Sequence, residues 1–356
     1  MTRMSRGETQ QRTRARVLSA ARSEFVEHGF RSARIDSIAD RAEMTRGAVY
    51  SNFPGKLALY FSVLAADAAA EPLPLPPAVV SGLDDALGRI ARGHLARLPL
   101  AVDERRSPDF LGGDLLPEVA DDNGARAAMS QLVGLQAIVL GIAFESLHGR
   151  RVTRQRMVRV AEALLTVFAG ARQLAHSAPG AVDAIRLAEV CGRLEMDPDD
   201  RWDPPHLPFV EPAERVDDEW VTPVGLDLLR RSVARPGTDG LVAVLGTARL
   251  AAIEEALRST GALEPVLLVV VSSEPAELIP LVELQIAELA RYLADGVPAR
   301  YWPPMRIVTD RTGQLAASCG IVEVNERTEA AVRIQDRRIV ARAAGPGACH
   351  AAAIAR

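Results

Sequence analysis

The stretch 35–56, IDSIADRAEMTRGAVYSNFPGK, decides the fold of the first part of the chain. Its first eight residues place apolar side chains at helical spacing, which predicts a short helix ending near Ala42. After a Glu-Met turn, Thr45 is a favourable N-cap for a second short helix that reaches Phe53. A Pro-Gly pair then ends this helix. The stretch therefore predicts two short helices joined by a tight turn.

The sequence on either side of this stretch predicts two more helices. Upstream, apolar residues recur at helical spacing over 12–28, and Gly29 follows as a helix stop. Downstream, residues 56–70 predict a fourth helix. The next segment, EPLPLPPA at 71–78, contains four prolines, which no helix interior accepts. We therefore expect a first all-helical domain over residues 1–70, followed by a hinge or stiff spacer.

Two short helices joined by a tight turn are typical of a helix-turn-helix, in which the second helix enters the major groove of DNA. The Thr45 hydroxyl and the free backbone N–H groups beside it can meet a phosphate. Arg46 offers a guanidinium to phosphate or guanine, and Gly47 removes bulk where the helix nears DNA. Val49 and Phe53 should point inward. The complete set of candidate DNA-binding residues is Arg34, Thr45, Arg46, Gly47, Ala48, Tyr50, Ser51, Asn52 and Lys56.

The charge distribution agrees with this interpretation. Residues 1–60 contain eleven Arg or Lys against six Asp or Glu, whereas the whole chain has a formal net charge of −4. Such an asymmetry favours a polyanionic partner at the basic end. Lys56 is the only lysine, so arginine is the default cation here and only arginines placed by a motif carry weight. A residue such as Arg46 taken alone would more often be an ordinary surface residue.

Residues 12–64 as a whole resemble the TetR (tetracycline-repressor) family of bacterial transcription regulators. The resemblance rests on TRGAVYSNFPGK, on the upstream AARSEFVEHGF and on IDSIADRA. It implies a homodimer that places two recognition helices in successive major grooves of operator DNA. It also implies a repressor that is released by a small-molecule effector.

Three positions depart from the family's pattern. Arg34 stands where the family usually has Ser or Thr before its second helix, so a capping hydroxyl is lost. Glu43 replaces a usual turn glycine, and a positive φ at a non-glycine residue costs about 1 kcal/mol. Leu57 replaces a usual glutamate. These departures put the operator sequence in doubt more than DNA binding itself.

Residues 79–197 read as almost entirely helical, and the resemblance implies that they form the ligand-binding and dimerisation domain. Residues 129–147 are apolar nearly all round, so this helix must be covered on more than one side. A second subunit is the economical cover; a monomeric bundle is the alternative. The predicted helical segments are 80–98, 124–148, 153–177 and 181–196. Three histidines lie on separate predicted helices without metal-ligand spacing, which favours ordinary histidines over a metal site: His94, His148 and His176.

A second boundary is expected at 198–215, where proline and aspartate predict an extended linker. Beyond it, residues 216–356 predict an α/β domain, because strands and helices alternate. The expected strands are 241–246, 266–273 and 305–309, separated by helices over 248–259 and 276–294, with a hairpin formed by 329–334 and 337–343.

This order resembles thioredoxin-like folds of the peroxiredoxin kind. In those enzymes a cysteine begins the helix after the first strand, where the helix N-terminus lowers its pKa. Here that junction reads Gly246, Thr247, Ala248, so the usual thiol chemistry is not expected and we predict no enzyme activity. Cys319 is a possible oxidation-sensitive thiol, although a small core residue is the commoner role for such a cysteine. The alternative function is therefore a redox-responsive regulator, or a degenerate thioredoxin-like enzyme, fused to a DNA-binding domain.

The composition excludes several other classes of protein. The 48% hydrophobic and 25% charged shares are ordinary for a soluble globular chain. Cys191, Cys319 and Cys349 have neither metal-ligand spacing nor an even count for disulfides, which indicates a reducing cytoplasm. The N-terminus lacks the apolar run of a secretory signal, and the apolar run 132–144 is too short to span a bilayer. We expect a cytoplasmic, nucleoid-associated protein with no membrane partner, metal or cofactor.

Overall fold

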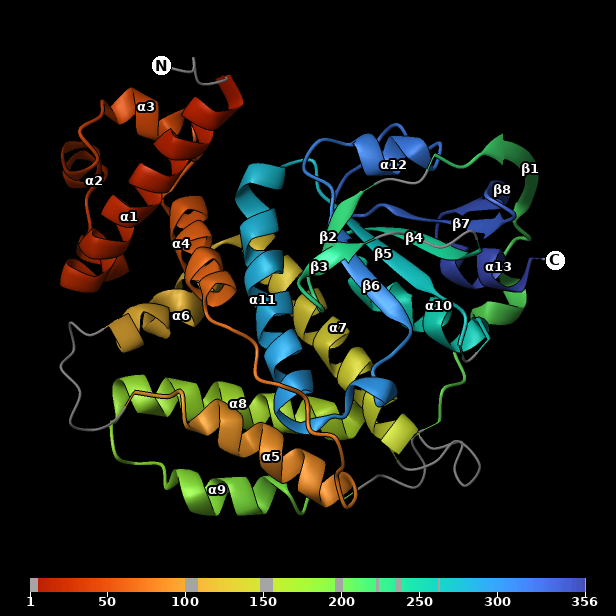
Figure 1. Ribbon diagram of the computed structural model, residues 1–356, viewed down its shortest axis with the longest axis horizontal. Coiled ribbons are helices and arrows are strands. Elements are labelled where there is room, and N and C mark those ends of the chain that lie inside the picture. The colour runs from red at the N-terminus through yellow and green to blue at the C-terminus, as the bar shows by residue number, and fades with distance from the viewer. Residues whose placement is uncertain are drawn as a thin grey trace.

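A computed structural model gives the three-dimensional structure of the protein. It describes residues 6–99, 108–147, 156–195, 201–221, 224–234, 239–261 and 263–355. Helices from the first half of the chain gather on one side, and a sheet with its own helices forms the other side (Figure 1). His148 and the start of the segment expected as a helix over 153–177 lie outside the described residues.

The N-terminal part contains the four helices expected from the sequence. They are α1 (Arg6–Ser32), α2 (Ile35–Arg41), α3 (Arg46–Tyr50) and α4 (Lys56–Ala70). Within α1 the backbone leaves the helical conformation at Gly29, whose φ is 73°. Phe25 and Tyr60 are buried, with ring centroids 5.3 Å apart, and tie α1 to α4. Helices α1 and α4 therefore share an aromatic contact in their common core.

The next region is helical, as expected, but it contains more than the four predicted segments. Its elements are α5 (Leu83–Leu95), η1 (Pro108–Asp114), α6 (Leu115–Asp121), α7 (Asn123–Leu147), α8 (Val158–Ser177) and α9 (Ala184–Cys191). The η1 and α6 turns were not predicted, because they are short and carry little periodicity. They contact α1 and α7, and the Tyr60 hydroxyl donates to the Leu111 carbonyl at 2.5 Å. They thus connect the first four helices to the bundle.

The C-terminal part contains a six-stranded mixed sheet in the order β1-β8-β7-β4-β5-β6. Strands β4, β5 and β6 run parallel, while β7 is antiparallel to β4 and forms a hairpin with β8. The strands are β1 (Glu214–Glu219), β4 (Gly240–Gly246), β5 (Val266–Val271), β6 (Met305–Thr309), β7 (Glu329–Gln335) and β8 (Arg338–Ala344), and a separate pair is formed by β2 (Gly225–Asp227) and β3 (Ser232–Ala234). An α/β domain is present as predicted, with helices η3 (Leu250–Ala252), α10 (Ile253–Ser259), α11 (Pro275–Gly296), α12 (Gln314–Ser318) and α13 (Ala348–Ile354).

Helix α11 belongs to the C-terminal sequence but packs against α4, α5 and α7 (Figure 1). Inside this contact the Gln136 amide donates to the Gln285 carbonyl at 2.8 Å. By length and composition alone α7 could span a membrane, yet 67% of its apolar window is buried inside the protein. From the sequence, a second subunit was the favoured cover for the apolar faces of this helix. In the structure, α8 and α11 of the same chain pack against it.

Two arginines of the C-terminal part bind the carboxyl end of α4. Arg231 donates to the carbonyl oxygens of Ala68 at 2.8 Å and Ala69 at 3.1 Å. Arg291 donates to Ala68 O at 2.9 Å and pairs with the Glu71 carboxylate at 2.8 Å. Because the last carbonyls of a helix have no partners within it, these guanidinium groups satisfy them and favour the negative end of the helix dipole.

Candidate nucleic-acid interface

The helix-turn-helix is held together by small and apolar side chains on the inner faces of α2 and α3. Ala39 and Ala42 are 3% and 2% exposed, and they let the two helices approach closely. Val49 and Phe53 are 1% and 2% exposed. The inward orientation predicted for Val49 and Phe53 is confirmed, so the opposite side of α3 faces solvent.

Thr45 caps α3 as the sequence predicts. Its Oγ1 accepts a hydrogen bond from the Ala48 backbone N–H at 3.2 Å. The cap leaves other amino-terminal N–H groups of α3 without partners inside the helix, and such groups favour an anion. Gly47 follows, and a methyl group there would find only the Thr45 hydroxyl, 3.9 Å away. The start of α3 is therefore open to a large partner.

Arg46 and Tyr50 lie on the exposed side of α3, one turn apart. The Arg46 guanidinium lies 5.6 Å from the centre of the Tyr50 ring and 3.4 Å from the Asp36 carboxylate. The hydrogen bond to Tyr50 and then the charge of Asp36 raise the pKa of Arg46, so it stays cationic. Both Arg46 and Asp36 are more than half exposed, so this pair exchanges with a stronger anion at little cost.

Ser51 and Asn52 are less available than the sequence suggests. The Ser51 hydroxyl and the Asn52 amide both donate to the Ala48 carbonyl at 2.9 Å. They satisfy the end of α3, where backbone acceptors lack helical partners. The Asn52 carbonyl accepts in turn from Arg14, whose guanidinium lies 4.2 Å from the Phe53 ring centre. The donor groups of Ser51 and Asn52 are thus already used to cap the end of α3.

Lys56 begins α4 and points back toward α1. Its Nζ donates to the Arg31 carbonyl at 3.1 Å and lies 4.6 Å from the centre of the Phe30 ring. Partial burial lowers the pKa of Lys56, with nearby carboxylates opposing that effect. A phosphate contact by Lys56 would have to compete with this carbonyl.

The structure accounts for two of the three departures from the family pattern. Arg34 is the N-cap of α2 and its side chain makes no capping bond. Its backbone N–H instead donates to the Glu24 carboxylate at 3.3 Å. Glu24 is 2% exposed and lies 3.2 Å from Arg41, so a buried carboxylate holds α1 to both ends of α2. Sequence reasoning missed Glu24; its signal was an acidic residue on the apolar face of the first helix. Glu43 has a φ of 52°, the positive value expected at the turn.

Cys319 is fully buried in the smaller core beneath α12. Burial raises the pKa of its thiol to about 12, with Ser318 and Arg342 opposing the shift. Almost no thiolate then exists at neutral pH, which is the state of a structural cysteine. Cys349 is also buried, and burial raises the pKa of its thiol well above the ordinary value.

Comparison with known proteins places a family domain on these same helices. Residues 17–63 match the family described as bacterial regulatory proteins, tetR family. The HTH-type transcriptional regulator SrpR of Pseudomonas putida is 45% identical over 65 residues, 18% of this chain and 30% of that protein. The uncharacterized HTH-type transcriptional regulator TtgW, also of Pseudomonas putida, is 49% identical over 53 residues, 15% of this chain and 40% of that protein. The matched segment thus spans less than half the length of either relative.

Further matches fall on an activator and a repressor. The HTH-type transcriptional activator FasR of Mycolicibacterium smegmatis is 43% identical over 51 residues, 14% of this chain and 23% of that protein. Among solved structures, NalD, the secondary repressor of the MexAB-OprM multidrug efflux pump in Pseudomonas aeruginosa, superposes with a TM-score of 0.33 at 22% identity. That match covers 51% of this chain and 93% of NalD. The family match and the helix geometry agree on the same segment: residues 17–63, which contain the helix-turn-helix, match the family of bacterial regulatory proteins of the tetR type.

Proposed function

We propose that the protein is a sequence-specific DNA-binding transcription regulator of the cytoplasm, acting on operator DNA as a homodimeric repressor that a small molecule releases. The observation that carries this proposal is the exposed side of α3. There Thr45, Arg46, Gly47 and Tyr50 face solvent around a capped helix start, while Val49 anchors the helix from behind. This arrangement suits a helix whose first residues read the major groove.

Selection from a random duplex library, followed by fluorescence anisotropy with the selected sequence, tests DNA binding. The double variant Arg46→Ala, Tyr50→Phe removes a guanidinium and a phenol hydroxyl without disturbing the buried side of α3. We expect specific binding to fall by at least about tenfold, since a good base contact contributes about 1–3 kcal/mol. Arg89→Ala is the matched control, because Arg89 pairs with Asp85 on α5. Equal affinity of the double variant and the control would contradict the proposal.

Homodimer formation is supported by apolar side chains left exposed on α8 and α9. Leu174, Ile185 and Val190 are 44%, 76% and 56% exposed. Exposed apolar side chains are candidates for a protein interface. Sedimentation should find a dimer that Ile185→Arg with Val190→Arg converts to a monomer. Leu263→Arg, at an exposed residue of the C-terminal part, should leave the dimer intact.

We further propose that the C-terminal part is a thioredoxin-like module without catalysis. The parallel β4-α10-β5 unit, the antiparallel β7-β8 hairpin beside β4, and α13 against α10 support this interpretation. Residues 246–248, where such enzymes carry their cysteine, contain none. The redox alternative predicts that peroxide changes operator affinity through Cys319. Equal affinities of wild type and Cys319→Ser, with and without hydrogen peroxide, would exclude it.

A further inference from the structure

The recognition helix α3 is too short to hold its own orientation. It has five residues, Arg46–Tyr50, and isolated helices shorter than about 12–15 residues are marginal in water. Its angle to the rest of the domain therefore depends on contacts from neighbouring elements. Val49 and Phe53 supply the apolar part of these contacts, since both are almost fully buried. The polar part comes from α1.

Two arginines of α1 hold the segment that contains α3 at both of its ends. Before α3, Arg16 donates to the Ala42 carbonyl at 2.6 Å, in the turn that follows α2. After α3, Arg14 donates to the Asn52 carbonyl at 3.0 Å. The Arg14 guanidinium also lies 4.2 Å from the centre of the Phe53 ring, where a cation is attracted to the aromatic face. Arg14 thus makes two different contacts with the end of the recognition segment.

Arg14 also connects this segment with α4 and with the C-terminal part. Its Nη2 lies 3.5 Å from the hydroxyl of Ser62, a buried residue of α4. Helix α11 packs against α4, and the Glu283 carboxylate on α11 lies 2.7 Å from the Arg311 guanidinium. Burial, then the charge of Arg311, lowers the pKa of Arg14, whereas the charge of Glu283 raises it. Two side chains of the C-terminal part therefore act on Arg14 with opposite signs.

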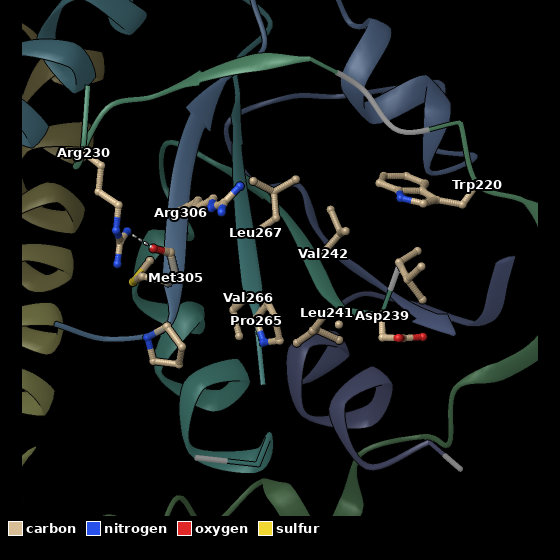
Figure 2. Close-up of a pocket in the computed structure, with 13 residues that line it drawn as sticks. Trp220, Arg230, Asp239, Leu241, Val242, Pro265, Val266, Leu267, Met305 and Arg306 are labelled. Carbon is tan, nitrogen blue, oxygen red and sulfur yellow. Dashed lines mark hydrogen bonds between the residues drawn. The ribbon is translucent and has the colours of Figure 1, made fainter. Parts of the chain in front are cut away.

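Contacts at both ends of β6 fix the position of this charge pair. Thr309 is the last residue of β6, and its hydroxyl donates to the Glu283 carboxylate at 3.4 Å; Arg311 follows two residues later. At the opposite end, beside a pocket of about 300 Å³, Arg230 donates to the carbonyl of the first residue of β6 (Figure 2). The next residue, Arg231, binds the carboxyl end of α4. The strand that leads to Arg311 is therefore attached to the helix that follows the recognition helix.

We propose that Arg14 is a positioning residue for DNA binding, which holds α3 at the angle where its first residues read the major groove, and that Glu283 and Arg311 set the strength of this hold. The Glu283 carboxylate offsets the repulsion between the two guanidinium groups. Without its charge, Arg311 repels Arg14, weakens the contacts of Arg14 with Asn52 and Phe53, and frees the end of α3. In this role Arg14 acts through α3 rather than on a phosphate. The effect on DNA rests on the proposed function.

Hydrogen exchange of the protected backbone amides over residues 45–53, measured by mass spectrometry without DNA, tests the hold on α3. Arg14→Met keeps the apolar stem and removes the donors, so exchange should become about tenfold faster, as expected for one hydrogen bond from a charged group. Arg14→Lys, which keeps a cation, should exchange more slowly than Arg14→Met. Arg22→Met is the matched control, because Arg22 ties α1 to Asp67 of α4. Equal exchange in Arg14→Met and Arg22→Met would overturn the positioning role.

Anisotropy with the selected duplex and with a scrambled duplex tests the effect on DNA binding. Arg14→Met should weaken binding to the selected duplex by at least about fivefold and change binding to the scrambled duplex by less than about twofold, since phosphate contacts supply non-specific affinity. Equal weakening on both duplexes would mean that Arg14 itself neutralises a phosphate, and would overturn the positioning role. If wild type selects no duplex, the proposed function fails, while hydrogen exchange still decides the hold on α3.

Charge substitutions test the link to the C-terminal part. Glu283→Gln should weaken binding to the selected duplex by about fivefold, because Arg311 then repels Arg14 unopposed. Adding Arg311→Gln should restore the affinity, since this change removes the repulsion. In an Arg14→Met background, Glu283→Gln should have no further effect. Unchanged affinity in Glu283→Gln, or a loss that Arg311→Gln does not restore, would overturn the link.

Discussion

Glu43 stores conformational strain at the turn between α2 and α3. Its φ of 52° lies in the left-handed region, which costs a non-glycine residue about 1 kcal/mol or more. Glu43 forms an ion pair with Arg16, but its side chain is 86% exposed, so the pair contributes little to stability. We expect Glu43→Gly to raise the free energy of urea unfolding by about 1 kcal/mol. Glu43→Gln is the control for the ion pair, because it removes the charge and keeps the positive φ; a loss of stability in Glu43→Gly equal to that in Glu43→Gln would contradict the strain.

His94 makes stability depend on pH. It is 4% exposed, and its ring stacks on Phe168 with centroids 4.2 Å apart. Burial, then the charges of Arg172 and Arg97, hold the pKa of His94 well below its ordinary value of 6.5. As the pH falls below 6.5, His94 therefore takes up a proton in the unfolded chain before it does so in the folded chain. His94 thus favours the fold above pH 6.5, and this contribution is lost as pH falls below it.

The loss should approach about 1.4 kcal/mol per pH unit below that point. Urea unfolding at pH 7.5, 6.0 and 5.0 measures it. His94→Phe should flatten the dependence, whereas His28→Gln, at a half-exposed histidine on α1, should retain it. An identical slope in His94→Phe and wild type would show that other groups are responsible.

At the scale of elements, the end of α4 depends on residues far away in the sequence. Arg291 is 6% exposed and both donates to Ala68 and pairs with Glu71. We expect Arg291→Met, which keeps the apolar stem, to lower the free energy of unfolding by about 1.5–3 kcal/mol, the contribution of hydrogen bonds to a charged group. Arg311→Met, at a surface pair with Glu283, should cost under about 1 kcal/mol. Equal losses of unfolding free energy in the two variants would mean that the Arg291 contact does not stabilise the end of α4.

Local sequence patterns predicted the helix ends and strands that depend on interactions between neighbouring residues. Thr45 fixed the start of α3, but the helix ends at Tyr50 instead of the expected Phe53, because Ser51 and Asn52 cap it before the Pro-Gly pair is reached. The apolar runs expected as strands at 241–246 and 266–273 became the buried strands β4 and β5. The strands β1, β2 and β3 were missed because ERVDDE and three-residue segments carry no apolar alternation. They form because partners such as β8 offer free backbone groups, which no local pattern encodes.

The candidate site likewise has features that the sequence predicted and features that it could not predict. Exposure of Arg46 and Tyr50 followed from helical spacing, since Val49 had to face inward. The contacts of Asn52 with Ala48 and Arg14, and of Lys56 with Arg31, could not be predicted, because they depend on how α1 crosses the helix-turn-helix. The bond from the Arg34 backbone N–H to the Glu24 carboxylate is a tertiary contact of the same kind.

At the scale of the whole molecule, one hydrophobic core runs from Val17 to Ala353 through all the predicted domains. The expected linker also ends early, because β1 begins at Glu214. A domain division at 198–215 therefore describes the order of the sequence better than the packing. Helix α11 is the cause, since its buried side chains fill the space between α4, α5 and α7.

Truncation should reveal this dependence. A chain of residues 1–195 loses α11, which carries Ile279, Leu281, Val282, Ile286 and Leu289, all fully buried. Burying each such side chain contributes about 1.5–3 kcal/mol, and five of them approach the whole stability of a typical domain. We expect the fragment to bind the dye ANS and to unfold without a cooperative transition by circular dichroism. A cooperative fragment with full DNA affinity would instead support independent domains.

The contact of Lys56 with the Arg31 carbonyl has a practical consequence for chemical labelling. Amine-selective reagents attack the neutral amine, and this chain offers them one lysine, whose lowered pKa leaves more of that form at mildly alkaline pH. A fluorophore coupled at Lys56 would be attached at the first turn of α4, directly after the recognition helix. Lys56 is thus the one lysine side chain that such reagents can label, besides the α-amino group of the chain, and it lies at the boundary of the proposed DNA-binding face.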